Sequence, residues 1–185
     1  MRHGGIAALA LLAAGCTAAP PAQQAARPTA WRIAAIADVD ASPTHKAAAA
    51  AILAWFQDTQ SGHRFAAGED PLCIGLGPAS GGPFRFQPLD DLEASVLERV
   101  ARTRPNARGV SDCATTLKGA PYRLEATGEP ARLMACLSAG EITANTLSLL
   151  CGFYDSAIET EFVGYDVTVA ANEIVVRRNG RGIGA

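Results

Sequence analysis

Five cysteines and three histidines are the residues of this sequence best suited to metal binding, redox chemistry or covalent attachment. Four of the cysteines lie in the body of the chain at spacings of 40, 23 and 15 residues: Cys73, Cys113, Cys136 and Cys151. Structural zinc sites take cysteines about two to four residues apart, and thiol oxidoreductases carry a C-x-x-C motif. Neither pattern occurs here. The sequence therefore predicts no metal site and no cofactor, and the cysteines indicate disulfides.

His63, with the nearby acids Glu69 and Asp70, is the other group that could do chemistry. A carboxylate can orient an imidazole that acts as a general base in a cleft. However, no serine occupies a Gly-x-Ser-x-Gly elbow and no His-Glu-x-x-His helix is present. A histidine at the end of a helix also commonly caps carbonyl groups. We predict no catalytic residue, and a small periplasmic enzyme using this group is the alternative hypothesis.

A proline-bounded loop carries two aromatic rings on either side of an arginine, at Phe84, Arg85 and Phe86. Aromatic side chains beside arginine are typical of interface anchors. The two phenylalanines could equally belong to the core, because aromatic residues make up only 6% of the chain. These three residues and His63 are the predicted binding residues.

The start of the chain predicts export. Arg2 precedes an unbroken apolar run over residues 6–14, and small residues then lead to Cys16. The run is about half of the roughly 20 residues that a helix needs to cross a bilayer, so we expect cleavage. Residues 13–16, Ala-Ala-Gly-Cys, resemble the lipobox of bacterial lipoprotein precursors, with leucine one position early at Leu12.

That resemblance implies removal of residues 1–15 and acylation of Cys16 with palmitate-like chains, which would anchor the protein durably. Thr17, in place of aspartate, implies transport to the outer membrane and a position facing the periplasm. Cleavage at a nearby Ala-x-Ala site without lipid is the alternative. Residues 16–29 are rich in alanine and proline and predict a tether. Beyond residue 15 the chain has 15 Lys+Arg against 18 Asp+Glu, so nucleic acid is not an expected partner.

Export also makes disulfides the expected state of the remaining four cysteines. Four cysteines allow three connectivities, and sequence alone selects none of them. A Cys136–Cys151 pair would centre a hairpin in the polar loop at residues 140–145, so the two cysteines could face each other across adjacent strands. Cys73 and Cys113 would then form the second bridge.

Two helices are predicted to position these residues. Ser42-Pro43 is typical of an N-cap followed by the first helical residue, and Gly62 is the expected end of that helix. Its apolar face is Ala49, Ile52, Leu53 and Phe56. The second helix is predicted over 90–103, with Asp90 and Glu93 as a capping box. The Gly75-x-Gly77 spacing could suggest a phosphate-binding loop, but no helix follows it directly as that motif requires. A flexible connecting segment is predicted instead.

Strands are predicted mainly after residue 110, with weaker short strands over 31–39 and 71–76. In the last hairpin a two-residue loop, Ala171-Asn172, would place Val169 opposite Ile174 and Val167 opposite Val176. The predicted fold class is α+β, with both helices packed on one face of a C-terminal antiparallel meander of about five strands. We expect one disulfide-stabilised domain over residues 30–180 and a frayed tail over 181–185.

These observations favour a binding or structural protein over an enzyme. The predicted function is that of an outer-membrane lipoprotein facing the periplasm, a non-catalytic module of the cell envelope. Its expected partners are the membrane, through the N-terminal lipid, and an envelope protein or glycan.

Overall fold

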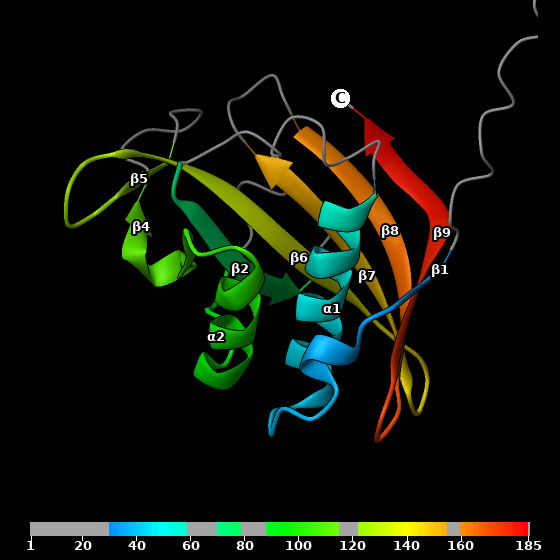
Figure 1. The fold of residues 1–185 in the computed structure, drawn as a ribbon. Helices are drawn as coiled ribbons and strands as arrows, with labels where there is room; N and C mark the ends of the chain where they lie inside the picture. Colours follow the sequence, from blue (N-terminus) through cyan, green and yellow to red (C-terminus); the bar gives the residue numbers. More distant parts are fainter. Residues whose placement is uncertain (1–29, 59–69, 79–87, 115–121, 155–159, 185) are drawn as a thin grey trace, which may run out of the picture.

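The computed structural model describes residues 30–58, 70–78, 88–114, 122–154 and 160–184. They form two α-helices, two 3-10 turns and nine strands (Figure 1). In chain order these are β1 Ala30–Arg32, η1 Ala34–Ile36, α1 Pro43–Gln57, β2 Leu72–Pro78, α2 Ala94–Thr103, β3 Ala107–Gly109, η4 Val110–Asp112, β4 Cys113–Ala114, β5 Tyr122–Leu124, β6 Pro130–Thr143, β7 Thr146–Tyr154, β8 Thr160–Val169 and β9 Ile174–Gly184.

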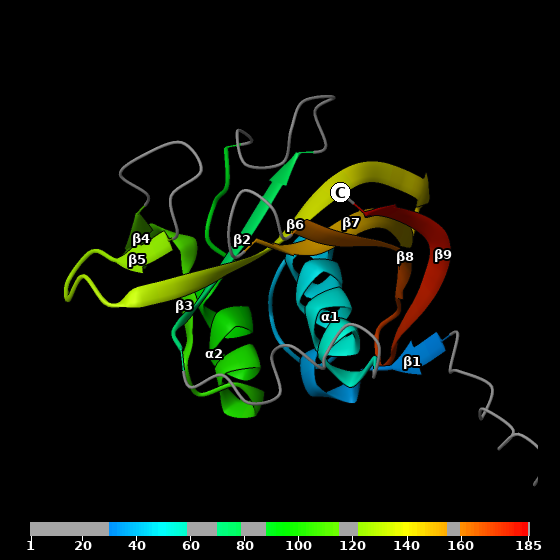
Figure 2. The ribbon, with the colours of Figure 1, turned by 90° about the horizontal axis from the view of Figure 1, so that it is seen from above.

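Helix α1 begins as predicted. Ser42 is its N-cap, with the Oγ accepting the N–H of His45 at 3.4 Å, and Pro43 is the first helical residue. The helix ends at Gln57, before the predicted stop at Gly62, and Asp58 is its C-cap. Every residue over 47–55 is buried, because the sheet curves around one side of the helix while η1 and α2 cover the other (Figure 2). The run of alanines lets a helix fit so closely on all sides.

The nine-stranded sheet has the main order β1-β9-β8-β7-β6-β2-β3, and the short strands β4 and β5 lie off this path. The strands β5 to β9 are consecutive antiparallel neighbours, which is the predicted meander. The prediction of a purely C-terminal sheet of about five strands was wrong. Strand β1 pairs with β9, β2 pairs with β6 in parallel, and β3 pairs with β2 in parallel. Because α2 connects two parallel strands, β2-α2-β3 is a βαβ unit, and periodicity alone does not reveal that pairing.

The last hairpin has the predicted register, with Val169 opposite Ile174 and Val167 opposite Val176. Strand β9 continues to Gly184, beyond residue 180, where the predicted domain ends.

Both helices lie on the same face of the sheet, as predicted, and share its main hydrophobic core (Figure 1). The second face carries a smaller cluster that includes Leu133, Leu137 and Phe162. At the end of α2, the guanidinium of Arg104 lies 4.2 Å from the ring centroid of Phe56 in α1. These contacts fix α2 beside α1.

Helix α2 begins later than predicted, at Ala94, with Glu93 as its N-cap. Asp90 does not cap the helix. Instead, its backbone N–H and carbonyl pair with those of Leu76 at 2.8 and 2.9 Å, so that the residues before α2 lie against β2. A β-type contact with a distant strand has replaced the local cap.

Candidate functional site

Most residues predicted to bind or catalyse lie outside the described part of the chain: Cys16, His63, Glu69, Phe84, Arg85 and Phe86. Asp70 is described, and its Oδ2 accepts from Nε of Arg132 on β6 at 3.1 Å. Its backbone carbonyl also accepts from the side chain of Asn106. Asp70 therefore ties the start of β2 to its two neighbouring strands.

The predicted disulfides are confirmed, and they lie on opposite faces of the sheet. Cys136 and Cys151 are directly opposite each other on β6 and β7, with Cα atoms 4.0 Å apart, and they face α1. Cys73 on β2 is bonded to Cys113 at the start of β4, on the second face. This second bridge holds η4 and β4 against β2.

The segment over residues 88–91 crosses the second face of β2, and two glycines make room for it. A Cβ on Gly75 would lie 3.1 Å from the Cβ of Leu89, and a Cβ on Gly77 would lie 2.5 Å from the carbonyl oxygen of Pro88. The Gly75-x-Gly77 spacing thus lies within a strand and serves close packing of a second chain segment. Gly75 lies in the strand predicted over 71–76, whereas Gly77, which was predicted to begin a loop, also belongs to β2.

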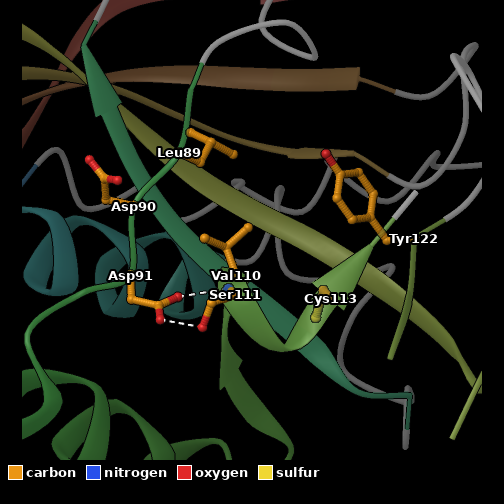
Figure 3. Close-up of a pocket in the computed structure, with 7 residues that line it drawn as sticks. All are labelled: Leu89, Asp90, Asp91, Val110, Ser111, Cys113 and Tyr122. Carbon is orange, nitrogen blue, oxygen red and sulfur yellow. Dashed lines mark hydrogen bonds between the residues drawn. The ribbon is translucent and has the colours of Figure 1, made fainter. Parts of the chain in front are cut away.

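A hollow of about 480 Å³ opens between this segment, η4 and β5 (Figure 3). We call it the Asp91 hollow, and it is lined by Leu89, Asp90, Asp91, Val110, Ser111, Cys113 and Tyr122. Leu89 points toward Val110 and Tyr122, whereas the Asp90 carboxylate points the other way (Figure 3). A second hollow of about 590 Å³ is lined by residues of β3, η4 and β5 and shares Ser111 with the first.

Asp91 links two walls of the hollow, the segment before α2 and η4. Its Oδ1 accepts the backbone N–H of Ser111 at 2.9 Å, and its Oδ2 accepts the Ser111 hydroxyl at 2.5 Å (Figure 3). The carboxylate fits because residue 109 is glycine: a Cβ on Gly109 would lie only 2.5 Å from Asp91 Oδ1. Two hydrogen bonds to one carboxylate hold the hollow in a defined shape without a ligand.

The chemistry of this arrangement suits binding better than catalysis. Ser111 has a carboxylate as its hydrogen-bond partner, whereas a nucleophilic serine is normally activated by an imidazole or amine base. His45, the one histidine in the described part of the chain, has its Nδ1 engaged with the N–H of Glu93. A polar group at Asp91 and Ser111 beside the apolar Leu89 and Val110 can orient a ligand that has both polar and apolar parts.

The two helices begin side by side, and each supplies a side-chain acceptor for a backbone N–H at the start of the other. The Oε1 of Glu93 accepts the N–H of Ser42 at 3.1 Å, and the Nδ1 of His45 accepts the N–H of Glu93 at 2.9 Å. In an ordinary capping box the residue three positions after the N-cap supplies the acceptor, which here would be His45. Glu93 of the other helix takes that place. The hydrogen bonds from Ser42 lower the pKa of the Glu93 carboxyl, and the nearby His45 adds to the effect.

No local pattern in the sequence indicates the Asp91 hollow. Asp90, Asp91 and Glu93 match the start of a helix by residue type, and Ser111 lies in the region after residue 110 where strands are predicted. The contact between Asp91 and Ser111 joins residues 20 positions apart. Gly109 is the one residue whose type reflects this contact, because a side chain at position 109 would clash with the Asp91 carboxylate.

No protein-family model, curated protein or solved structure matches this chain. Within the described residues, no group of three His, Cys, Asp or Glu side chains is placed to hold a metal ion. Neither α1 nor α2 has the length and apolar character that a bilayer-crossing helix requires.

Proposed function

We propose that this protein is a lipoprotein of the outer membrane, facing the periplasm, whose α+β domain is a non-catalytic binding module of the cell envelope. The observation that carries the proposal is the use of the cysteines. The two disulfides take four of the five, and Cys16 is the one left over. Two disulfides favour an oxidising compartment. A fifth cysteine at the end of an export-type apolar run favours lipid attachment.

The Asp91 hollow is the proposed ligand site. It is built before any ligand arrives, because the Cys73–Cys113 bridge and the Asp91–Ser111 pair both fix η4. Preorganised walls favour binding, since no ordering has to accompany association. An envelope protein or a glycan is the proposed ligand class, and the ligand contacts Tyr122 and the segment before α2.

The anchor is tested by the intact mass of the protein purified from native membranes, with and without reductant and thiol alkylation. The expected mass is that of residues 16–185 plus acyl groups, with no alkylation before reduction. A Cys16→Ser variant is the matched comparison, and it should leave the membrane fraction while keeping both disulfides. A lipid-free wild-type mass, or a C16S protein that stays with the membrane, would refute the anchor.

The binding role is tested by placing a photo-crosslinking amino acid in place of Tyr122, which lines the Asp91 hollow. The same probe in place of the exposed Ala170, in the β8–β9 turn, is the control. The proposal expects a discrete adduct with an envelope protein or glycan from the first position alone. Equal labelling from both positions, or no adduct from either, counts against a binding module.

A further inference from the structure

The reciprocal caps between α1 and α2 depend on the protonation of one side chain. His45 accepts the N–H of Glu93 through Nδ1 at 2.9 Å, which requires a lone pair on that nitrogen. A protonated imidazole carries hydrogen on both nitrogens and cannot accept. Histidine is the residue type that ordinarily changes charge between about pH 5 and 8. This hydrogen bond can therefore form only with a neutral imidazole.

Protonation would affect both helix starts. The Glu93 N–H would lose its acceptor and face a second donor on His45. The Glu93 carboxylate is close enough to interact with a charged His45, and its Oε1 already accepts from the N–H of Ser42 at 3.1 Å. If the carboxylate turns toward the imidazolium, Ser42 loses its cap as well. Protonation of His45 would thus weaken the hydrogen bonds that cap both helices.

The junction also holds the wall of the Asp91 hollow. The segment over residues 88–93 is fastened at three points: Asp90 to Leu76 of β2, Asp91 to Ser111, and Glu93 to α1. Glu93 is the last of these points before α2 begins. Loosening it frees the C-terminal end of the wall and leaves the other two fastenings in place.

We propose that His45 is a pH-sensitive latch, which fixes the start of α2 and the adjoining wall of the Asp91 hollow when neutral and releases them when protonated. The charged groups around it are Glu93 and, on its own helix, Lys46, whose Nζ donates to the carbonyl of Ala37 at 3.2 Å. Asp40, on the loop before α1, accepts the hydroxyl of Ser95 through its backbone carbonyl.

The test is amide hydrogen exchange measured by NMR on the full chain with both disulfides formed, between pH 8 and pH 5. After correction for the intrinsic exchange rate, protection of the Glu93 amide should fall about fivefold to tenfold, as expected for the loss of one hydrogen bond. The fall should have the same midpoint as the titration of the His45 ring proton resonances. In the same range, Val167 in the central strands should keep its protection.

Two variants separate the latch from a general pH effect. In His45→Asn the side-chain carbonyl can replace the Nδ1 acceptor but does not titrate, so Glu93 protection should no longer depend on pH. In His63→Asn, the matched control at another histidine, the pH response should persist. A response that survives in H45N, or a wild-type Glu93 amide that stays protected while His45 titrates, overturns the proposal. Neither result bears on the membrane anchor, and a failed latch leaves the Asp91 hollow as the proposed ligand site.

Discussion

Replacing Gly109 by alanine should destabilise the protein through Asp91, and the size of the effect follows from the geometry. Gly109 is buried at the end of β3, and a Cβ there would lie 2.5 Å from Oδ1, 2.7 Å from Cγ and 2.9 Å from Oδ2 of Asp91. The carboxylate would have to retreat by about 1 Å to restore van der Waals contact. That movement would stretch both of its bonds to Ser111, which are 2.9 and 2.5 Å long.

Hydrogen bonds to a charged group contribute about 1.5 to 3 kcal/mol when protected from water, and these two are exposed to solvent. We therefore expect Asp91→Ala to lower the free energy of unfolding by about 1 to 2 kcal/mol. Gly109→Ala should cost about 2 to 3 kcal/mol, because strain adds to the same loss. In the double variant the clash is gone, so its cost should match D91A within about 0.5 kcal/mol.

Urea unfolding of the disulfide-bonded protein, followed by circular dichroism, gives all four free energies of this cycle. Asp90→Ala is the control, because that carboxylate points away from the hollow (Figure 3) and its loss should change stability by less than about 0.5 kcal/mol. The reasoning is refuted if the costs of G109A and D91A simply add in the double variant. Additivity would mean that the alanine methyl group meets something other than Asp91.

Three further outcomes are expected. Replacing Cys136 and Cys151 together by alanine should lower the free energy of unfolding by about 3 kcal/mol, since the bridge closes a loop of 15 residues, and urea midpoints would show it. Gly77→Ala should cost about 1 to 3 kcal/mol in the same assay, because its Cβ would lie 2.5 Å from the carbonyl oxygen of Pro88. The pKa of Glu93 is lowered in the folded state, so its ionised form stabilises the protein above the ordinary value of 4.5, and this stabilisation is lost as pH falls through the folded-state pKa. A Glu93→Gln variant should therefore lose less stability than the wild type on going from pH 6 to pH 3 in thermal unfolding.

The parts of the fold that could be predicted are those that local chemistry determines. Ser42-Pro43 specifies the start of α1 through a side-chain cap and a fixed φ angle, and no distant residue is needed for either. The β8–β9 register follows from a two-residue loop, because such a loop fixes the pairing on both sides of it. The Cys136–Cys151 bridge was predicted from a hairpin centred in the polar loop, and in the structure two register shifts in β6, between the turn and the bridge, bring these cysteines opposite each other.

The parts that could not be predicted depend on pairing between distant segments. Strand β2 is a short apolar run, and nothing in its composition shows that it lies between β6 and β3 in parallel. Its two glycines are typical of a loop by composition, but in the structure they leave space for Leu89 and Pro88. A glycine that is needed because another segment lies on it cannot be distinguished by local pattern from a glycine that bends the chain.

The start of α2 shows why the candidate site, like the parallel pairing of β2, could not be predicted from the sequence. Asp90, Asp91 and Glu93 all carry side chains suited to an N-cap, so local preference gives no reason to choose one of them. The choice is made by three other elements: β2 pairs with Asp90, η4 binds Asp91, and α1 both accepts from and donates to Glu93. The same contacts form the wall of the hollow. A change that shifts the helix start by one residue would therefore disturb the hollow as well, and stability and ligand binding should be lost together.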